Sequence, residues 1–297
     1  MRSDDKSGFL VRTIAAEDGL KLYVRDYIGD AQATQERPPI ICLPGLTRNS
    51  RDFHQLAMLL AYHSAAPYRV LTLDARGRGR SERDVDKSHY NLVVETQDVV
   101  SLCSTLDIPK AVFIGTSRGG LVMHLLAASR PDLLKAAILN DIGPAIEKPG
   151  LAEIRDYLNR DRKPADRDDA VAILRENHGA TFTALADGDW QDMAGAIYDF
   201  RDGKPVADYD PAIAQQLLAL DFEAPLADLW PQFEAFNDTP LMVIRGENTK
   251  LLSTRTIEDM ARRHPGMVIK SVAGQGHAPL LHLGDIPEVI RSFLSAL

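Results

Sequence analysis

The chain has 297 residues, of which 45% are hydrophobic and 26% charged, so it can form one large α/β domain or a core with an insertion. Its formal net charge of −8 speaks against nucleic acid or an anionic membrane as a main partner, because a negative surface attracts neither. We expect no membrane span, because no run of about 18 apolar residues occurs. We also expect no secretory signal, because residues 1–9 are polar and charged.

The first half of the chain alternates between strand and helix patterns. Two alternating runs, residues 9–15 and 20–27, flank Asp18-Gly19 and predict a β-hairpin. A polar linker over residues 29–39 leads to the continuous apolar run 40–43, which is typical of a strand buried on both faces. The pattern then predicts a helix at 52–63, a strand at 69–73, a helix at 91–106, a strand ending at Gly115, a helix after Gly120 and a strand at 136–139.

This alternation stops at Pro144 and resumes near residue 238. Between these points we expect helices and loops but no strand, with helices at 151–158, 168–176, 190–200, 211–220 and 226–236. The chain ends with an expected strand at 241–245, a helix at 254–264, a strand at 267–272 and a helix at 285–297. We therefore predict a core of residues 1–143 and 238–297, with a helical cap, or lid, of residues 144–237 inserted after the sixth strand.

Strands that alternate with helices predict a mostly parallel sheet with helices on both faces. Ligands of such α/β sheets bind outside the carboxyl ends of the strands. The loops expected at that edge are residues 44–48, 74–81, 115–119, 141–144, 246–252 and 274–277. The functional residues should lie in these loops.

The strongest chemical signal is Ser117, which follows a strand and precedes a helix. Gly115 and Gly119 flank it, and a turn this tight requires glycine because a Cβ would collide with the neighbouring backbone. The turn would lift the hydroxyl out of the sheet, next to the free N–H groups of the new helix. Gly-x-Ser-x-Gly in this setting is the nucleophile elbow, and the alternative is an ordinary glycine-rich loop.

A serine hydroxyl needs a base within hydrogen-bonding distance to act as a nucleophile. Of the eight histidines, His277 is the best candidate, because its loop follows the last strand and contains two glycines that let it fold back. His282 is its only rival. The backbone N–H groups of Arg118 and Leu46 are the expected donors to an oxyanion. Taken alone, Pro44-Gly45 is equally typical of a plain turn without this role.

Three motifs lie at the expected strand ends: Gly115-Thr116-Ser117-Arg118-Gly119-Gly120, Asp74-Ala75-Arg76-Gly77-Arg78-Gly79-Arg80-Ser81 and Gly274-Gln275-Gly276-His277. Together they resemble the α/β-hydrolase fold superfamily, in particular its small esterases and carbon–carbon hydrolases. The resemblance implies an eight-stranded core sheet and hydrolysis through an acyl-enzyme without a cofactor. Serine at the elbow, where other branches carry aspartate, argues against haloalkane dehalogenases and epoxide hydrolases. No cluster with metal-ligand spacing occurs in the sequence, so we expect no metal.

One position departs from the family pattern. Relatives carry the triad acid in the loop after the strand expected at 241–245, and there this chain has Lys250, which has only donors and cannot accept the histidine N–H. Two carboxylates can replace it: Asp141, at the end of the preceding core strand, and Glu247, in the expected loop. We favour Asp141. The third alternative is a site without an acid.

The leading functional hypothesis is a serine hydrolase of small, largely apolar esters or lactones. The alternatives are hydrolysis of a carbon–carbon bond in a vinylogous diketone and a non-catalytic ligand receptor, which Lys250 favours.

Aromatic residues of the lid can line the pocket or form the lid core: Trp190, Tyr198, Phe200, Trp230 and Phe233. Three arginines near strand ends can hold a substrate carboxylate: Arg48, Arg76 and Arg118. For Arg48 and Arg76, a position on the exposed surface without such a role is the equal alternative. Cys42 and Cys103 lie in apolar contexts, which favours buried thiols and a cytoplasmic protein. The expected partner is a small-molecule substrate, and the oligomeric state is left open.

Overall fold

The computed structural model describes residues 8–30, 34, 37–160 and 162–297. Residues 1–7 of the segment expected to lack a secretory signal, and residues 31–33 and 35–36 of the expected linker 29–39, lie outside the described residues. No helix in the described part of the chain is both long and apolar enough to cross a membrane.

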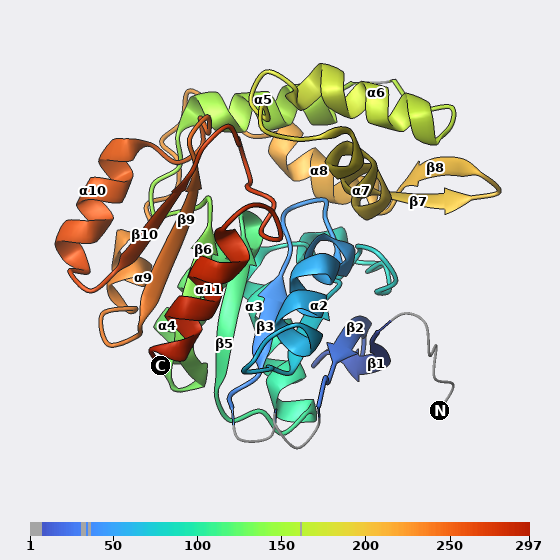
Figure 1. Ribbon diagram of the computed structural model, residues 1–297. Coiled ribbons are helices and arrows are strands. Elements are labelled where there is room, and N and C mark those ends of the chain that lie inside the picture. Colours follow the sequence, from blue (N-terminus) through green and yellow to red (C-terminus); the bar gives the residue numbers. More distant parts are fainter. Residues whose placement is uncertain (1–7, 31–33, 35–36, 161) are drawn as a thin grey trace.

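The centre of the molecule is an eight-stranded sheet, as expected (Figure 1). In spatial order its strands are β1 (Leu10–Ala15), β2 (Lys21–Tyr27), β4 (Val70–Leu73), β3 (Ile40–Leu43), β5 (Ala111–Thr116), β6 (Leu134–Asn140), β9 (Leu241–Gly246) and β10 (Val268–Val272). The hairpin β1–β2 and the pair β2–β4 are antiparallel, and the other neighbours are parallel. Because β3 and β6 flank β5, the loops that follow these three strands meet at one edge of the sheet.

Helices cover both faces of this sheet. One face packs against α3 (Leu92–Thr105), α4 (Arg118–Ser129), α9 (Trp230–Glu234) and α10 (Thr254–Arg263), and the other against α2 (His54–Tyr62) and α11 (Ile286–Ser295). Short 3₁₀ helices occupy Ser50–Phe53 (η1), Lys87–His89 (η2) and Pro131–Leu133 (η3). The prediction of an α/β fold with helices on both faces is confirmed.

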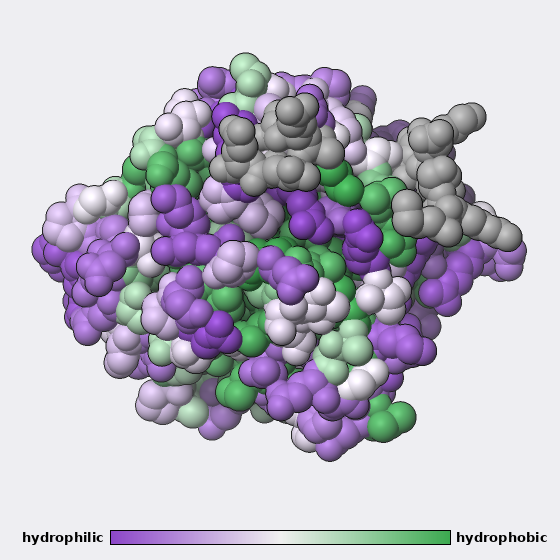
Figure 2. All heavy atoms as spheres, turned by 90° about the horizontal axis from the view of Figure 1, so that it is seen from below, coloured by the Kyte–Doolittle hydropathy of each residue, from purple (hydrophilic) through white to green (hydrophobic). Residues whose placement is uncertain are grey.

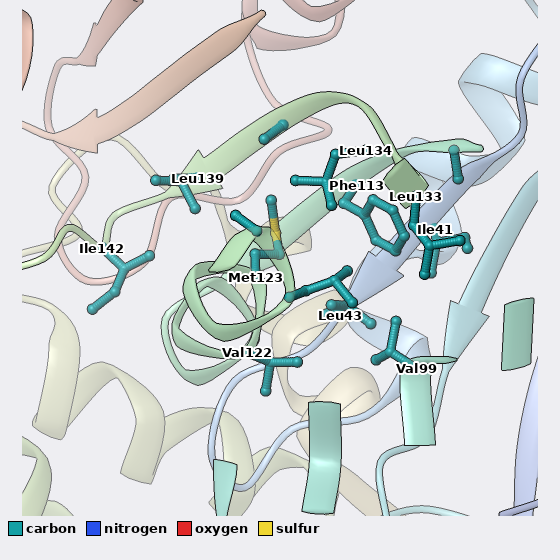
Figure 3. Packing of buried hydrophobic residues seen from close by; sticks show 14 of the residues in the cluster. Ile41, Leu43, Val99, Phe113, Val122, Met123, Leu133, Leu134, Leu139 and Ile142 are labelled. Atoms are coloured by element: carbon teal, nitrogen blue, oxygen red, sulfur yellow. The ribbon is translucent and has the colours of Figure 1, made fainter. Parts of the chain in front are cut away.

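The hydrophobic core fixes the central strands beneath α4. Figure 3 shows Leu43 of β3, Phe113 of β5 and Leu139 of β6 gathered around Val122 and Met123 of α4. All five are at most 4% exposed. Burying an aliphatic or aromatic side chain of this size contributes roughly 1.5–3 kcal/mol, so the strand ends that carry the candidate site stand on a rigid base.

Residues between β6 and β9 form a layer above the carboxyl edge of the sheet (Figure 1). It contains α5 (Lys148–Leu158), α6 (Arg167–His178), α7 (Asp187–Ile197), β7 (Tyr198–Arg201), β8 (Lys204–Ala207) and α8 (Pro211–Leu218). The next helix, α9, packs instead against α4 in the core. Figure 2 shows the opposite end of the molecule, where hydrophilic side chains cover most of the visible surface.

The expectation that this segment contains no strand is wrong. Strands β7 and β8 pair as an antiparallel hairpin around Asp202 and Gly203, whose φ angles of 50° and 77° fit a tight two-residue turn. The expected helix at 190–200 therefore ends at Ile197. The helix expected at 226–236 covers only Trp230–Glu234. Charged residues on both strands hide the strand pattern, but the Asp-Gly pair signals the turn.

Candidate active site

Ser117 lies at the apex of a sharp turn between β5 and α4. Its φ of 52° lies in the left-handed region, which a non-glycine residue rarely adopts. A Cβ at Gly119 would overlap the carbonyl oxygen of Leu43, and one at Gly115 would lie 2.6 Å from the backbone nitrogen of Gly120. The two flanking glycines therefore permit the close approach that lifts the Ser117 hydroxyl above the sheet.

His277 bridges Ser117 and Asp141. Its Nε2 lies 2.9 Å from the Ser117 hydroxyl oxygen, and its Nδ1 lies 2.8 Å from Oδ2 of Asp141. When Nδ1–H donates to the carboxylate, Nε2 is left free to accept the hydroxyl proton. The structure thus brings together three side chains that are far apart in the sequence: His277 follows Asp141 by 136 positions and Ser117 by 160.

The carboxylate of Asp141 is fully buried and held from both sides. Its second oxygen, Oδ1, accepts a 2.9 Å hydrogen bond from the N–H of Gly246, and its own N–H donates to the carbonyl of Ile244 at 2.7 Å. Its φ of 56° turns the chain at the end of β6. These contacts aim Oδ2 at the histidine.

Glu247 and Lys250 lie elsewhere. The exposed Glu247 accepts a hydrogen bond from the N–H of Gly274 at 2.9 Å and makes none with His277. Lys250 is exposed and forms an ion pair with Glu153 of α5. The lysine therefore occupies a surface position, and the buried acid comes from the neighbouring strand.

Among the described residues, no hydrogen-bond acceptor is found for the backbone N–H of Leu46 or for that of Arg118. Arg118 is the first residue of α4, where N–H groups have no partner within the helix. The loop that contains Leu46 lies beside Ser117: a Cβ added at Gly45 would be 3.8 Å from the Cβ of Ser117. Both N–H groups are therefore available near the Ser117 hydroxyl.

A buried ionic cluster ties these two segments together. Nε of Arg78 donates to the Leu46 carbonyl at 2.5 Å, and Nη1 lies 3.0 Å from Glu95. The same Glu95 accepts two hydrogen bonds from Arg118, at 2.8 and 3.0 Å. Burial opposes ionisation of Glu95, but the two guanidinium groups outweigh it and lower the pKa of this carboxyl. Sequence reasoning did not find Arg78 or Glu95 as site residues.

A cavity of about 150 Å³ opens onto Ser117 and His277. Its lining from the layer above the sheet is Ile154, Tyr157, His178, Phe182, Met193 and Ile197. The five aromatic residues considered from the sequence do not line it; Trp190, Tyr198 and Phe200 belong to the apolar cluster of that layer, and Trp230 and Phe233 pack in the main core. The sequence analysis did not identify His178 as a residue of this cavity.

The three arginines considered as carboxylate binders are already paired inside the protein. Arg48 forms a bidentate pair with Asp52, and Arg118 pairs with Glu95. Arg76, which is 1% exposed, contacts Asp98, Asp84 and Asp18. Together with His89, Asp18 and Asp84 have the spacing of metal ligands, but the Arg76 guanidinium already supplies their positive charge.

Two histidines outside the triad geometry are held neutral. Burial lowers the pKa of His178, in the cavity, to about 4. Burial likewise lowers the pKa of His124 in α4 to about 4, although its Nδ1–H donates to the carbonyl of Gly120 at 2.7 Å.

We expect His124 to make the fold sensitive to acid. Its pKa in the folded state is below the ordinary value of 6.5, so the unfolded chain binds more protons between pH 6.5 and about 4. The stabilisation is complete above pH 6.5 and is lost as the pH falls through this interval. From about pH 7 to pH 5, the wild type should lose about 2 kcal/mol of unfolding free energy through this one group.

Urea unfolding at the two pH values measures this loss. His124→Leu should lose about 2 kcal/mol less than the wild type between them. His63→Gln, at an exposed position, should follow the wild type. Equal losses in all three proteins would contradict the assignment.

The fold and the arrangement of Ser117, His277 and Asp141 at the carboxyl edge of the sheet define an α/β hydrolase. The family model described as alpha/beta hydrolase fold matches residues 38–281, and the chain belongs to this family. It is therefore a hydrolytic enzyme by family, and the family expected from the sequence motifs is confirmed.

Named relatives agree with this assignment. The chain is 31% identical to a 3-hydroxybutyrate-oligomer hydrolase of Cupriavidus necator, over 81% of this chain and 82% of the relative. It is 24% identical to a 2-(acetamidomethylene)succinate hydrolase of Mesorhizobium japonicum, over 81% of each. The crystal structure of an α/β hydrolase from Novosphingobium aromaticivorans superposes with a TM-score of 0.87 at 36% identity, covering 98% of this chain and 99% of that one.

Proposed function

We propose that the protein is a serine esterase that cleaves small esters or lactones through an acyl-enzyme, with Ser117 as nucleophile, His277 as base and Asp141 as the acid. The observation that carries the proposal is the continuous series of hydrogen bonds, 2.9 Å from Ser117 to His277 and 2.8 Å from His277 to Asp141. Geometry of this kind activates a hydroxyl irrespective of the order of the residues in the chain.

The proposed reaction has two stages. Ser117 Oγ bonds to the ester carbonyl carbon while its proton passes to His277 Nε2, and the carbonyl oxygen becomes an oxyanion that the N–H groups of Leu46 and Arg118 stabilise. The carbon–oxygen bond then breaks, and the leaving alcohol takes the proton from His277. Water attacks the acyl-enzyme by the same route and releases the acid. Asp141 remains ionised and holds the imidazolium.

An ester is the preferred substrate for two reasons. The cavity above Ser117 is lined by apolar side chains such as Ile154, Phe182 and Met193, which suit a short acyl chain. The relative from Cupriavidus necator is named for hydrolysis of 3-hydroxybutyrate oligomers, and hydroxy acids condense through ester bonds. The receptor hypothesis loses its main support, because Lys250 lies on the surface and an acid reaches His277 from β6.

A substrate panel tests the proposal. We expect turnover of p-nitrophenyl acetate and butyrate by the wild type and no turnover of a dienol diketone. Turnover of the diketone alone would replace the esterase by a carbon–carbon hydrolase. Absence of turnover of every ester and lactone in the panel would refute the proposed function.

We further propose that the layer from α5 to α8 is a cap over the site. Its residues Tyr157, His178 and Phe182 contribute to the wall of the cavity, which is consistent with that role.

We also propose that the protein works in a reducing compartment such as the cytoplasm. In support, Cys42 and Cys103 are buried free thiols, and burial raises the pKa of Cys103 to about 12.

Arg78 is expected to be a positioning residue for the oxyanion loop. In Arg78→Lys the charge stays, but the planar group that reaches both Leu46 and Glu95 is lost. With p-nitrophenyl butyrate we expect kcat to fall roughly 10- to 100-fold and KM to change by less than about threefold, because the loop serves the transition state.

Arg130→Lys is the matched control, since it alters another arginine–carboxylate pair, an exposed one with Asp132. It should retain wild-type kcat and KM. A fall in kcat of Arg78→Lys that is matched by a rise in KM, or no change in either, would contradict a role in positioning.

A further inference from the structure

A second cavity of about 240 Å³ adjoins the one above Ser117. Both are lined by Arg48, Asp52, Met193 and Leu280, so they are neighbours with a shared wall. Neither alone reaches the roughly 300 Å³ of an ordinary small-molecule site, but together they do. The shared residues place the second cavity directly beside the one that contains Ser117.

Arginines outnumber carboxylates in the lining of the second cavity, although the protein has a net charge of −8. Four arginines and only two carboxylates line it. The charges of Arg48 and Asp52 cancel each other, and Arg51 forms an ion pair with the buried Asp208 at 2.7 Å. Arg25 has no carboxylate partner among the residues that the structure describes. Its guanidinium is instead stacked 4.5 Å from the ring centre of Phe9.

Several buried polar atoms of this cavity lack hydrogen-bond partners in the described part of the chain. They are Nε of Arg25, Nη2 of Arg51 and both ring nitrogens of His282. The two arginine atoms can only donate, and a neutral His282 offers one more donor. Buried donors without acceptors are costly, and an acceptor bound among these residues would relieve that cost.

The acceptor must also compensate charge. His54 carries no negative charge that could do this. Burial, followed by the charge of Arg25, lowers the pKa of His54, and its Nδ1 is hydrogen-bonded with the Tyr27 hydroxyl at 2.8 Å. Asp192 accepts from the side-chain amide of Gln55 at 2.6 Å. The group that best fits Arg25 and Arg51 is therefore an anion with two or more acceptor oxygens.

We propose that this second cavity binds a carboxylate at the far end of the substrate, so that the preferred substrates are esters of dicarboxylic acids or of acids with a second carboxylate. The proposal rests on the function proposed above and specifies its substrate class. Arg25 and Arg51 receive the carboxylate, and the ester carbonyl lies at Ser117. These arginines take the role that the sequence suggested for Arg48, Arg76 and Arg118.

Two matched esters test the proposal: p-nitrophenyl hydrogen glutarate, which carries a free carboxylate, and p-nitrophenyl pentanoate, which ends in a methyl group. We expect the wild type to have the higher kcat/KM for the glutarate ester. Arg25→Met should lower kcat/KM for the glutarate ester roughly 10- to 100-fold and that for the pentanoate ester by less than about threefold. Arg255→Met removes an exposed charge on α10 and should change neither.

Binding to the Ser117→Ala variant separates this proposal from the proposed function. Calorimetry should detect monomethyl glutarate but not dimethyl glutarate, and adding Arg25→Met should abolish the binding. If this binding occurs but no ester is hydrolysed, the carboxylate site stands and the esterase fails. If esters are hydrolysed but Arg25→Met affects both esters alike, the carboxylate site fails and the esterase stands. Binding of inorganic phosphate without binding of the monomethyl ester would also overturn the proposal, in favour of a free-anion site.

Discussion

Asp141→Asn is expected to lower kcat for p-nitrophenyl butyrate by about 10³- to 10⁴-fold, with little change in KM. The amide keeps the shape of the side chain, but it carries no charge to stabilise the imidazolium of His277. It can also present N–H to Nδ1, which favours the tautomer that blocks Nε2. Steady-state kinetics measure the loss, and thermal unfolding reports whether the buried position still folds.

Two controls separate Asp141 from the alternatives. Glu247→Gln should change kcat by less than about fivefold, because Glu247 binds the N–H of Gly274 and leaves His277 untouched. Lys250→Asp should bring no gain in activity, because Lys250 lies on the surface beside Glu153. A large loss in Glu247→Gln, or a gain of orders of magnitude in Lys250→Asp, would show that the acid has been misassigned.

Ser117→Ala is expected to lower kcat/KM by about 10⁴- to 10⁶-fold. Residues that act as one unit give non-additive losses, so Ser117→Ala combined with His277→Ala should be no slower than the single serine variant. The same ester assay measures both. A double variant that is slower than Ser117→Ala by the full effect of His277→Ala would contradict a shared catalytic unit.

The sheet and its helices could be predicted because their patterns are local. The continuous apolar run of β3 and the Asp18-Gly19 turn each specify an element without help from the rest of the chain. The hairpin β7–β8 was missed because each strand has only four residues, most of them exposed or half-buried, and β8 lacks the alternation of polar and apolar residues that marks a strand. There the Asp202-Gly203 turn is more informative than the strands.

The candidate site could be located from the sequence only as far as chain topology allows. Ser117 and His277 follow strands and have glycines beside them, so their positions at the carboxyl edge follow from the order of elements. The choice between Asp141 and Glu247 depends on which carboxylate the loop geometry aims at the imidazole. That aim is set by hydrogen bonds from Gly246 and Gly274, which no sequence pattern encodes.

Charge pairing is the other feature that sequence could not resolve. Arg48, Arg76 and Arg118 stand at strand ends, yet each is neutralised by a carboxylate from a distant or a neighbouring segment. Arg25 lies within β2, where nothing in the pattern marks it as a candidate binding residue. Only the three-dimensional structure shows that it has no carboxylate partner among the described residues.

Covalent labelling tests the central claim most directly. A fluorophosphonate should react with the folded enzyme, and mass spectrometry of the digested protein should find the adduct on Ser117 alone, absent from Ser117→Ala and strongly slowed in His277→Ala. An unlabelled Ser117 in a protein that still hydrolyses esters, or an adduct on another residue, would contradict the account.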